Sequence, residues 1–197
     1  MKKSQILDGL LEENHGYLRV SDAVRAGISR TYISEYIKEH SLERVADGLY
    51  ASLDAWPDGM YTIQFRYPQA VFSHESALYL LDMAEREPIR YSITLCTGAS
   101  TTRLAKEGVK VYKVREGLFE LGLSEAKTPI GHSLRVYDVE RTICDLVRSR
   151  STIEIQDFQT ALKGYVLRKD KDISRLMRYA ERFSVDRIIN QYLEVLL

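Results

Sequence analysis

The sequence predicts an α+β protein in two parts: a small helical part that ends in a β-hairpin, and a larger part in which a sheet precedes helices. Apolar residues recur at helical spacing through three short segments before residue 40. The hairpin signal Asp47-Gly48 follows them. Alternating segments near 91–114, and helical periodicity from residue 138 onward, then predict strands followed by helices.

Capping residues locate the three expected N-terminal helices. The first runs over residues 4–13, where apolar side chains recur at helical spacing. The second is expected to start at Ser21, whose hydroxyl can cap free amides, and to stop at Gly27. The third begins at Ser29, another good N-cap, and Ile33 lies on its apolar face.

The spacing of Ala23, Gly27 and Ile33 is typical of a helix-turn-helix, because two helices cross closely at a small residue and a glycine occupies the tight turn. Asp47-Gly48 suits a two-residue type I′ turn, in which both central residues take positive φ. Together these features predict a winged helix-turn-helix DNA-binding domain over residues 1–53.

Residues 60–197 are expected to form one mixed domain, with a small sheet and a C-terminal helical bundle, after a linker rich in turn-forming residues. Short strands are expected at 70–72, 91–96, 109–114, 118–123 and 133–136, and helices at 61–66, 73–83, 138–148, 155–167, 173–183 and 187–196.

Composition limits the class of protein. The chain has 197 residues, 45% of them hydrophobic, and equal numbers of basic and acidic side chains, 28 of each. No apolar run approaches a membrane span, so we expect a cytoplasmic protein without a membrane partner. Cys96 and Cys144 lie far apart in the sequence and are expected to be free buried thiols. No motif indicates a cofactor or a metal.

The third helix carries the candidate DNA contacts. Arg30 could pair with guanine in the major groove, while Lys38 and Arg44 could hold phosphates. The candidate DNA-binding residues are Ser29, Arg30, Thr31, Tyr32, Ser34, Lys38 and Arg44. Residues 1–53 contain seven Lys or Arg and eight Asp or Glu. A module that docks another protein without binding DNA therefore stays open as the alternative.

A second concentration of positive charge lies near the C-terminal helices. It consists of Lys163, Arg168, Lys169, Lys171, Arg175, Arg178, Arg182 and Arg187. Arg175, Arg178 and Arg182 would share one face of their helix, which could assist DNA binding, meet an acidic partner or serve only solvation.

The sequence gives no catalytic residues. His74-Glu75 begins like a zincin helix, but Leu78 stands where the second metal-binding His must be. Glu125-Ala126-Lys127 resembles half of a metal-dependent nuclease motif, yet no acidic strand end stands shortly upstream. We therefore expect a binding protein and not an enzyme; a nuclease targeted by the winged domain is the weakest alternative.

Three stretches together resemble the AbiEi family of bacterial antitoxins, the antitoxin half of AbiE abortive-infection systems. They are Val45–Tyr50 (VADGLY), Tyr67–Leu78 (YPQAVFSHESAL) and Tyr137–Arg148 (YDVERTICDLVR). The resemblance covers nearly the whole chain in its order and spacing.

This resemblance implies a type IV toxin-antitoxin system that takes part in phage defence. The protein would repress its own operon at promoter inverted repeats and neutralise a nucleotidyltransferase-like toxin, with or without direct contact. DNA binding would fall on the third helix and the hairpin, and the antitoxin function on residues 60–197. In the third stretch Ile143, Leu146 and Val147 are expected in the core, Asp145 on the surface, and Arg141 and Arg148 exposed as antitoxin-surface candidates, beside Arg175, Arg178 and Arg182. A purely structural role for the helix 138–148 is the favoured alternative.

Overall fold

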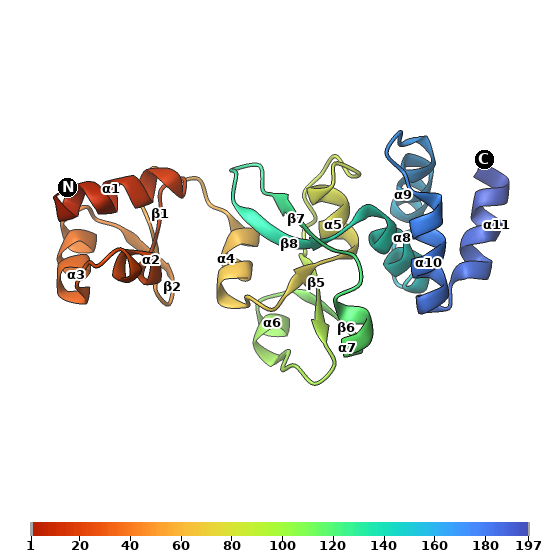
Figure 1. The fold of residues 1–197 in the computed structure, drawn as a ribbon, viewed down its shortest axis with the longest axis horizontal. Helices are drawn as coiled ribbons and strands as arrows, with labels where there is room; N and C mark the ends of the chain where they lie inside the picture. Colours follow the sequence, from red (N-terminus) through yellow and green to blue (C-terminus); the bar gives the residue numbers. More distant parts are fainter. Residues whose placement is uncertain (1, 197) are drawn as a thin grey trace. The chain divides into compact units, whose positions relative to one another are not determined.

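A computed structural model describes residues 2–196, which form two compact units (Figure 1). The first unit comprises Met1–Pro68 and Lys127–Ser133, and the second comprises Gln69–Ala126 and Leu134–Leu197. The first unit therefore extends beyond the 1–53 segment expected from sequence and includes a short stretch from far along the chain. No helix within residues 2–196 is long and apolar enough to cross a membrane.

The first unit consists of three helices, a three-stranded sheet and a fourth helix. Its elements are α1 (Lys3–Glu13), β1 (Tyr17–Arg19), α2 (Val20–Arg25), α3 (Arg30–Glu39), β2 (Glu43–Ala46), β3 (Leu49–Ala51) and α4 (Gly59–Arg66). The antiparallel sheet has the strand order β1-β3-β2. The three N-terminal helices are confirmed, whereas β1 was not expected because it is only three residues long.

Two local predictions in this unit were wrong. Helix α2 begins at Val20 with Arg19 as its N-cap, so Ser21 does not cap it. In the hairpin turn only Gly48 has a positive φ, of 78°, and Asp47 does not. The turn is therefore not type I′, and a register shift in the β2–β3 pairing between Arg44 and Ala46 accompanies it.

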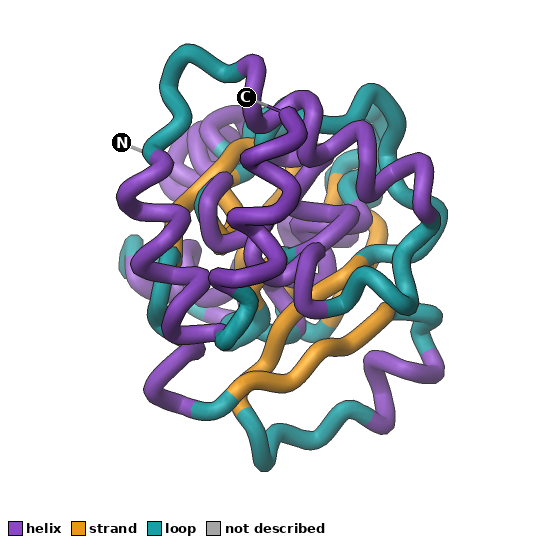
Figure 2. Tube along the Cα trace, turned by 90° about the vertical axis from the view of Figure 1, so that its right-hand side faces the viewer, coloured by secondary structure: helices purple, strands orange, loops and turns teal. Residues whose placement is uncertain are grey.

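The second unit is a five-stranded sheet followed by a bundle of helices, and Figure 2 distinguishes the helices, strands and loops of the chain by colour. Its strands are β4 (Val71–Phe72), β5 (Ser92–Cys96), β6 (Lys110–Val114), β7 (Leu123–Lys127) and β8 (Ser133–Tyr137), in the order β6-β5-β4-β8-β7. Its helices are α5 (His74–Leu80), α6 (Thr102–Lys106), α7 (Glu116–Phe119), α8 (Val139–Arg148), α9 (Ile155–Leu167), α10 (Ile173–Phe183) and α11 (Asp186–Leu196).

One expected strand was wrong. Residues 118–123 do not form a strand: α7 ends at Phe119, and β7 starts only at Leu123. Gly122 has a φ of 77°, a left-handed conformation that interrupts extended backbone. The mixed α+β class, with the helical bundle last, is confirmed.

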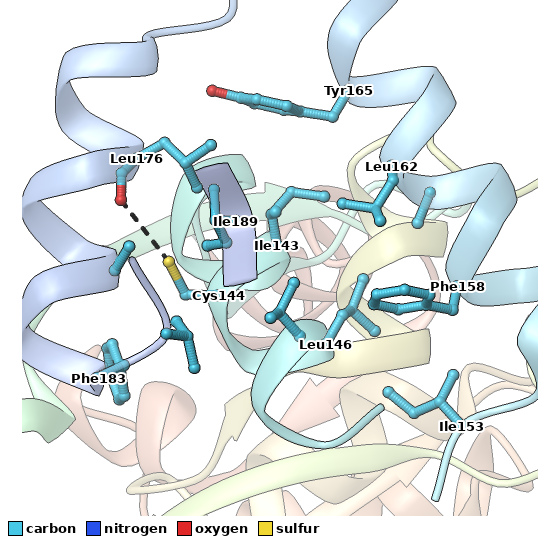
Figure 3. Packing of buried hydrophobic residues seen from close by; sticks show 14 of the residues in the cluster. Ile143, Cys144, Leu146, Ile153, Phe158, Leu162, Tyr165, Leu176, Phe183 and Ile189 are labelled. Carbon is cyan, nitrogen blue, oxygen red and sulfur yellow. Dashed lines mark hydrogen bonds between the residues drawn. The ribbon is translucent and has the colours of Figure 1, made fainter. Parts of the chain in front are cut away.

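Helix α8 is the centre of the C-terminal bundle. Its residues Ile143 and Leu146 are fully buried and face side chains of the surrounding helices α9, α10 and α11 (Figure 3). The thiol of Cys144 lies 3.8 Å from the carbonyl oxygen of Leu176, and burial raises its pKa. Asp138 caps the helix by accepting a hydrogen bond from the Arg141 amide at 2.8 Å, as the sequence predicted.

Candidate nucleic-acid interface

Helix α3 is fixed to its unit by one face and leaves the other exposed. Ser29 accepts a hydrogen bond from the Tyr32 amide at 3.4 Å, which confirms it as the N-cap. Ile33 and Tyr36 are buried in the inner cluster that α1, α2 and α3 form with β1. Ala23 is fully buried and Gly27 has a φ of 83°, the close crossing and tight turn that the sequence predicted.

A hydrogen bond between α1 and α3 holds the exposed helix in place. The Tyr36 hydroxyl donates to Asp8 Oδ1 at 2.5 Å. Burial raises the pKa of Tyr36, and the adjacent Asp8 carboxylate raises it further, so the phenol stays protonated as a donor. The orientation of α3 therefore depends on a charge-assisted bond as well as on apolar packing.

The solvent side of α3 contains most of the candidate DNA-binding residues. Arg30, Thr31, Ser34 and Lys38 are exposed, together with the acidic Glu35 and Glu39. The Ser34 hydroxyl donates to the Arg30 carbonyl at 3.0 Å and keeps its acceptor positions for solvent or ligand. The charges on this face balance, so it offers hydrogen-bonding groups more than a positive field.

Two candidates differ from this exposed set. Tyr32 is half-buried against the inner cluster, and the Lys3 ammonium lies 5.6 Å from the centre of its ring. Arg44 lies on β2 of the wing and pairs with Asp47 in the turn, although both side chains are largely exposed. Contact between Arg44 and a phosphate would therefore have to compete with an existing ion pair.

The other face of the winged sheet carries an aromatic cluster that sequence reasoning missed. Successive strand residues point to opposite faces, so Leu18 packs in the inner cluster while Tyr17 and Arg19 point away from it. Tyr17 meets Tyr61 of α4 edge to face, with 5.2 Å between ring centres. His132 stacks on the Tyr61 ring at 3.8 Å with an interplanar angle of 7°.

A buried carboxylate connects this cluster to the distant segment Lys127–Ser133. Asp58 Oδ2 accepts hydrogen bonds from the Thr128 hydroxyl and pairs with His132 Nδ1, both at 2.7 Å. Burial alone would raise the pKa of Asp58, but hydrogen bonds from His132, the Tyr61 amide and Thr128 outweigh it and leave the pKa lowered. No sequence signal identifies this pair, because its partners are 74 positions apart.

In the second unit, the expectation that Arg141 and Asp145 are surface residues was wrong. Arg141 is fully buried and Asp145 is 2% exposed. Arg141 Nε donates to Asp145 Oδ2 at 3.0 Å, and Nη1 donates to the carbonyls of Leu118 and Leu121 at 2.7 and 2.5 Å. Since α8 is surrounded by other elements, this i,i+4 ion pair holds the interior together and cannot form an antitoxin surface.

The other four antitoxin-surface candidates are at least partly accessible. Arg148, Arg178 and Arg182 are exposed. Arg175 is partly neutralised, because it lies 3.6 Å from Glu140 and 3.4 Å from Asp172. Arg175, Arg178 and Arg182 follow one another along α10, whereas Arg148 ends α8.

The residues that resembled catalytic motifs occupy structural positions. His74 is buried, stacks on Tyr112 at 3.4 Å, and its ring nitrogens lie 3.0 and 3.1 Å from the hydroxyls of Ser73 and Ser149. Glu75 binds Lys110 at 3.0 Å and Ser92 at 2.7 Å. Within residues 2–196 no three His, Cys, Asp or Glu side chains are placed to hold a metal ion.

A three-helix core in which α2 and α3 cross at a tight turn, followed by a β-hairpin, defines a winged helix-turn-helix domain. Residues 5–52 match the family model described as "Transcriptional regulator, AbiEi antitoxin". This match agrees, over residues 5–52, with the resemblance to AbiEi antitoxins predicted from the sequence.

A search of curated proteins gave no significant match. Among solved structures, the chain is similar to the RV2827C protein from Mycobacterium tuberculosis, with 16% sequence identity and a TM-score of 0.60. The similarity covers 90% of this chain and 70% of that one. At this level of identity it supports the fold alone, and it extends the shared architecture well beyond the segment matched by the family model.

Proposed function

We propose that this protein is an antitoxin that represses its own operon by placing α3 in the major groove of promoter inverted repeats. The observation that carries the proposal is the division of α3 into two faces. Ile33 and Tyr36 fix one face in the core, and Arg30, Thr31 and Ser34 stand exposed on the other. Arginine, threonine and serine at such positions can bond base edges and phosphates.

Arg30 and Arg44 have different proposed roles in DNA binding. Arg30, at the start of α3, would form a bidentate pair with guanine and so carry specificity. Arg44, on the wing, and Lys38 would hold phosphates, which position the domain without reading sequence. Loss of a phosphate contact should weaken binding equally on all DNA and lower the salt dependence, whereas loss of Arg30 should relax specificity.

A mobility-shift titration on the protein's own upstream promoter, against a scrambled duplex and at two salt concentrations, tests the assignment. Arg30→Ala should weaken promoter binding by roughly 5- to 150-fold, the equivalent of 1–3 kcal/mol. Arg103→Ala is the matched control, because Arg103 is an exposed arginine on α6 of the second unit. Equal loss of affinity in both variants, or no promoter preference in the wild type, would contradict the repressor assignment.

The antitoxin function is proposed for the second unit, with a nucleotidyltransferase-like toxin as its target. Arg148, Arg178 and Arg182 are the exposed candidates, and Arg175 is a weaker one because acidic neighbours hold it. Growth rescue during toxin expression should be reduced when Arg148, Arg178 and Arg182 are replaced together by Ala. Promoter binding by the same variant, measured alongside, shows whether the two activities separate.

One observation favours a second candidate function. The exposed face of α3 includes Glu35 and Glu39 as well as Arg30 and Lys38, and this charge balance also suits docking to a protein. In that case the winged unit would bind the toxin, and purified toxin would co-elute with the wild type but not with Arg30→Ala. DNA binding would then be absent at both salt concentrations.

A further inference from the structure

The outer face of the winged sheet encloses a polar cavity of about 330 Å³. It lies within the first unit, where the end of α1, strand β1, helix α4 and the segment Lys127–Ser133 meet. Asn14, Arg19 and Tyr61 are among the side chains that line it. The volume is at the lower end of the range found for small-molecule sites in proteins.

Hydrogen-bond donors in this cavity lack acceptors. The Tyr61 hydroxyl oxygen accepts from Asn14 Nδ2 and from Arg19 Nε, both at 2.7 Å. Its own hydrogen has no acceptor among residues 2–196. Neither terminal nitrogen of Arg19 has a hydrogen bond or an ion pair within the same range. Three donor groups therefore remain available on two adjacent side chains that line one cavity.

The geometry keeps Arg19 ready to bind. Its guanidinium lies 5.0 Å from the centre of the Tyr61 ring and 5.8 Å from that of Phe65. These contacts and the Nε bond hold the side chain in one orientation, so little conformational entropy is lost when the remaining edge takes a ligand. A planar fork of two N–H groups matches the paired oxygens of a carboxylate or a phosphate.

Two further features limit the class of ligand that the cavity can bind. The Tyr61 ring stacks on His132 and lies under Arg19, so it offers no free face to a nucleobase. Glu13 and Asp22 also line the cavity, and Asp22 is paired with Arg25 at 3.2 Å. These carboxylates disfavour a polyanion, which argues against the DNA backbone as occupant.

We propose that this cavity binds a small molecule through a single oxyanion, held by the terminal nitrogens of Arg19 and the hydroxyl of Tyr61. The site is independent of the proposed DNA-binding face: none of Arg30, Thr31, Ser34 or Lys38 lines it. Bound there, the ligand would add bonds between β1 and α4 and so stabilise the winged unit.

Nuclear magnetic resonance of the arginine Nε–Hε groups, at constant ionic strength in chloride, tests the proposal with acetate and inorganic phosphate as probes. At least one probe should shift the Arg19 resonance saturably, with a Kd on the order of 1 mM. Arg19→Lys, followed by the rise in melting temperature that the probe gives, should weaken binding by about 10-fold, because an ammonium cannot form the paired bonds. Arg103→Lys, an exposed substitution on α6 outside the cavity, should leave probe binding unchanged.

Tyr61→Phe provides a second variant, since it removes the hydroxyl donor and leaves Arg19 in the chain. It should also weaken binding of the probe, as followed by the rise in melting temperature that saturating probe gives the wild type. The proposal is overturned if neither probe shifts Arg19, or if Arg19→Lys binds as tightly as the wild type. It is also overturned if only scrambled duplex DNA shifts the Arg19 resonance, because the site would then hold backbone phosphate.

Discussion

Asp58 and His132 form a buried pair in which Oδ2 and Nδ1 lie 2.7 Å apart, across 74 positions of sequence. Their side chains are 4% and 2% exposed. Asp58 also caps α4 by accepting from the Tyr61 amide at 2.9 Å. One carboxylate thus starts a helix and holds the segment Lys127–Ser133 against the winged unit.

Replacing Asp58 by Asn should destabilise the protein by about 3 kcal/mol, because an amide cannot accept all the hydrogen bonds that the Asp58 carboxylate accepts and leaves buried donors without a partner. Urea unfolding followed by circular dichroism measures the change. Asp54→Asn is the control, since Asp54 is exposed in the adjacent linker and should change stability by less than about 0.5 kcal/mol. Similar effects in the two variants would show that the Asp58–His132 pair adds little.

The free energy of unfolding should decrease as the pH is lowered, because of His74. Burial lowers the pKa of His74 from 6.5 to about 3, against a smaller raising effect of Glu75, while Lys110, Arg141 and Arg148 lower it further. In the unfolded chain His74 is protonated below about pH 6.5, whereas in the folded protein it is protonated only below about pH 3. Folding is therefore favoured above pH 6.5 and loses about 1.4 kcal/mol per unit as pH falls below it.

The matched variant is His74→Asn, because His74 has a φ of 50° and Asn tolerates the left-handed region. Urea midpoints at pH 8, 7, 6 and 5 should show a shallower decline in this variant than in the wild type. His40→Asn, at an exposed position, should keep the wild-type slope. Parallel curves for the wild type and His74→Asn would contradict the assignment.

Substitution of Gly122 separates the effect of a steric clash with Arg141 from the effect of backbone strain. A Cβ added there would lie 2.6 Å from Arg141 Cβ, whereas one added at Gly108 meets nothing within 4 Å. Both glycines have a φ of 77°, so Ala carries the same strain at each. Gly122→Ala should lower the melting temperature more than Gly108→Ala, with a further loss of about 1–3 kcal/mol. Equal losses would mean that Arg141 moves aside freely.

Arg141 should behave as a structural residue. Its guanidinium lies 3.9 Å from the Tyr137 ring and 4.3 Å from that of Phe183, and it bonds two backbone carbonyls. Arg141→Lys should cost about 2–3 kcal/mol, because Lys cannot bond both carbonyls and Asp145 together. Arg148→Lys, on the exposed end of the same helix, should be nearly neutral. An Arg141→Lys protein of normal stability that fails to rescue growth would restore Arg141 as a toxin contact.

Local signals predicted the elements with strong caps and periodicity. Ser29 and Asp138 were identified as N-caps and both accept the expected amide. The prediction that Arg141 and Asp145 lie on the surface was wrong for a physical reason. Single charged side chains are normally exposed, but an ion pair at i,i+4 can be buried when other elements cover the helix on all sides. Burial of a helix depends on elements remote in sequence, which periodicity within the helix does not report.

In the candidate site too, some residues could be predicted from local sequence and others could not. The exposed face of α3 follows from the spacing of Ile33 within its own helix. The cluster of Tyr17, Tyr61 and His132 depends on three separate segments, and none of them carries a distinctive pattern by itself. Residues that make a site only through long-range packing are visible in the structure alone.

The inclusion of Lys127–Ser133 in the N-terminal unit sets an order of events during synthesis. The helix-turn-helix core, from Leu7 to Leu42, can pack as soon as its own residues have left the ribosome. Asp58 cannot be satisfied then, because Thr128 and His132 emerge much later. A nascent chain, or a fragment ending at Pro68, would expose the outer face of the sheet with its carboxylate unpaired. The winged unit is thus completed only after Gln69–Ala126, nearly half of the second unit, has been made.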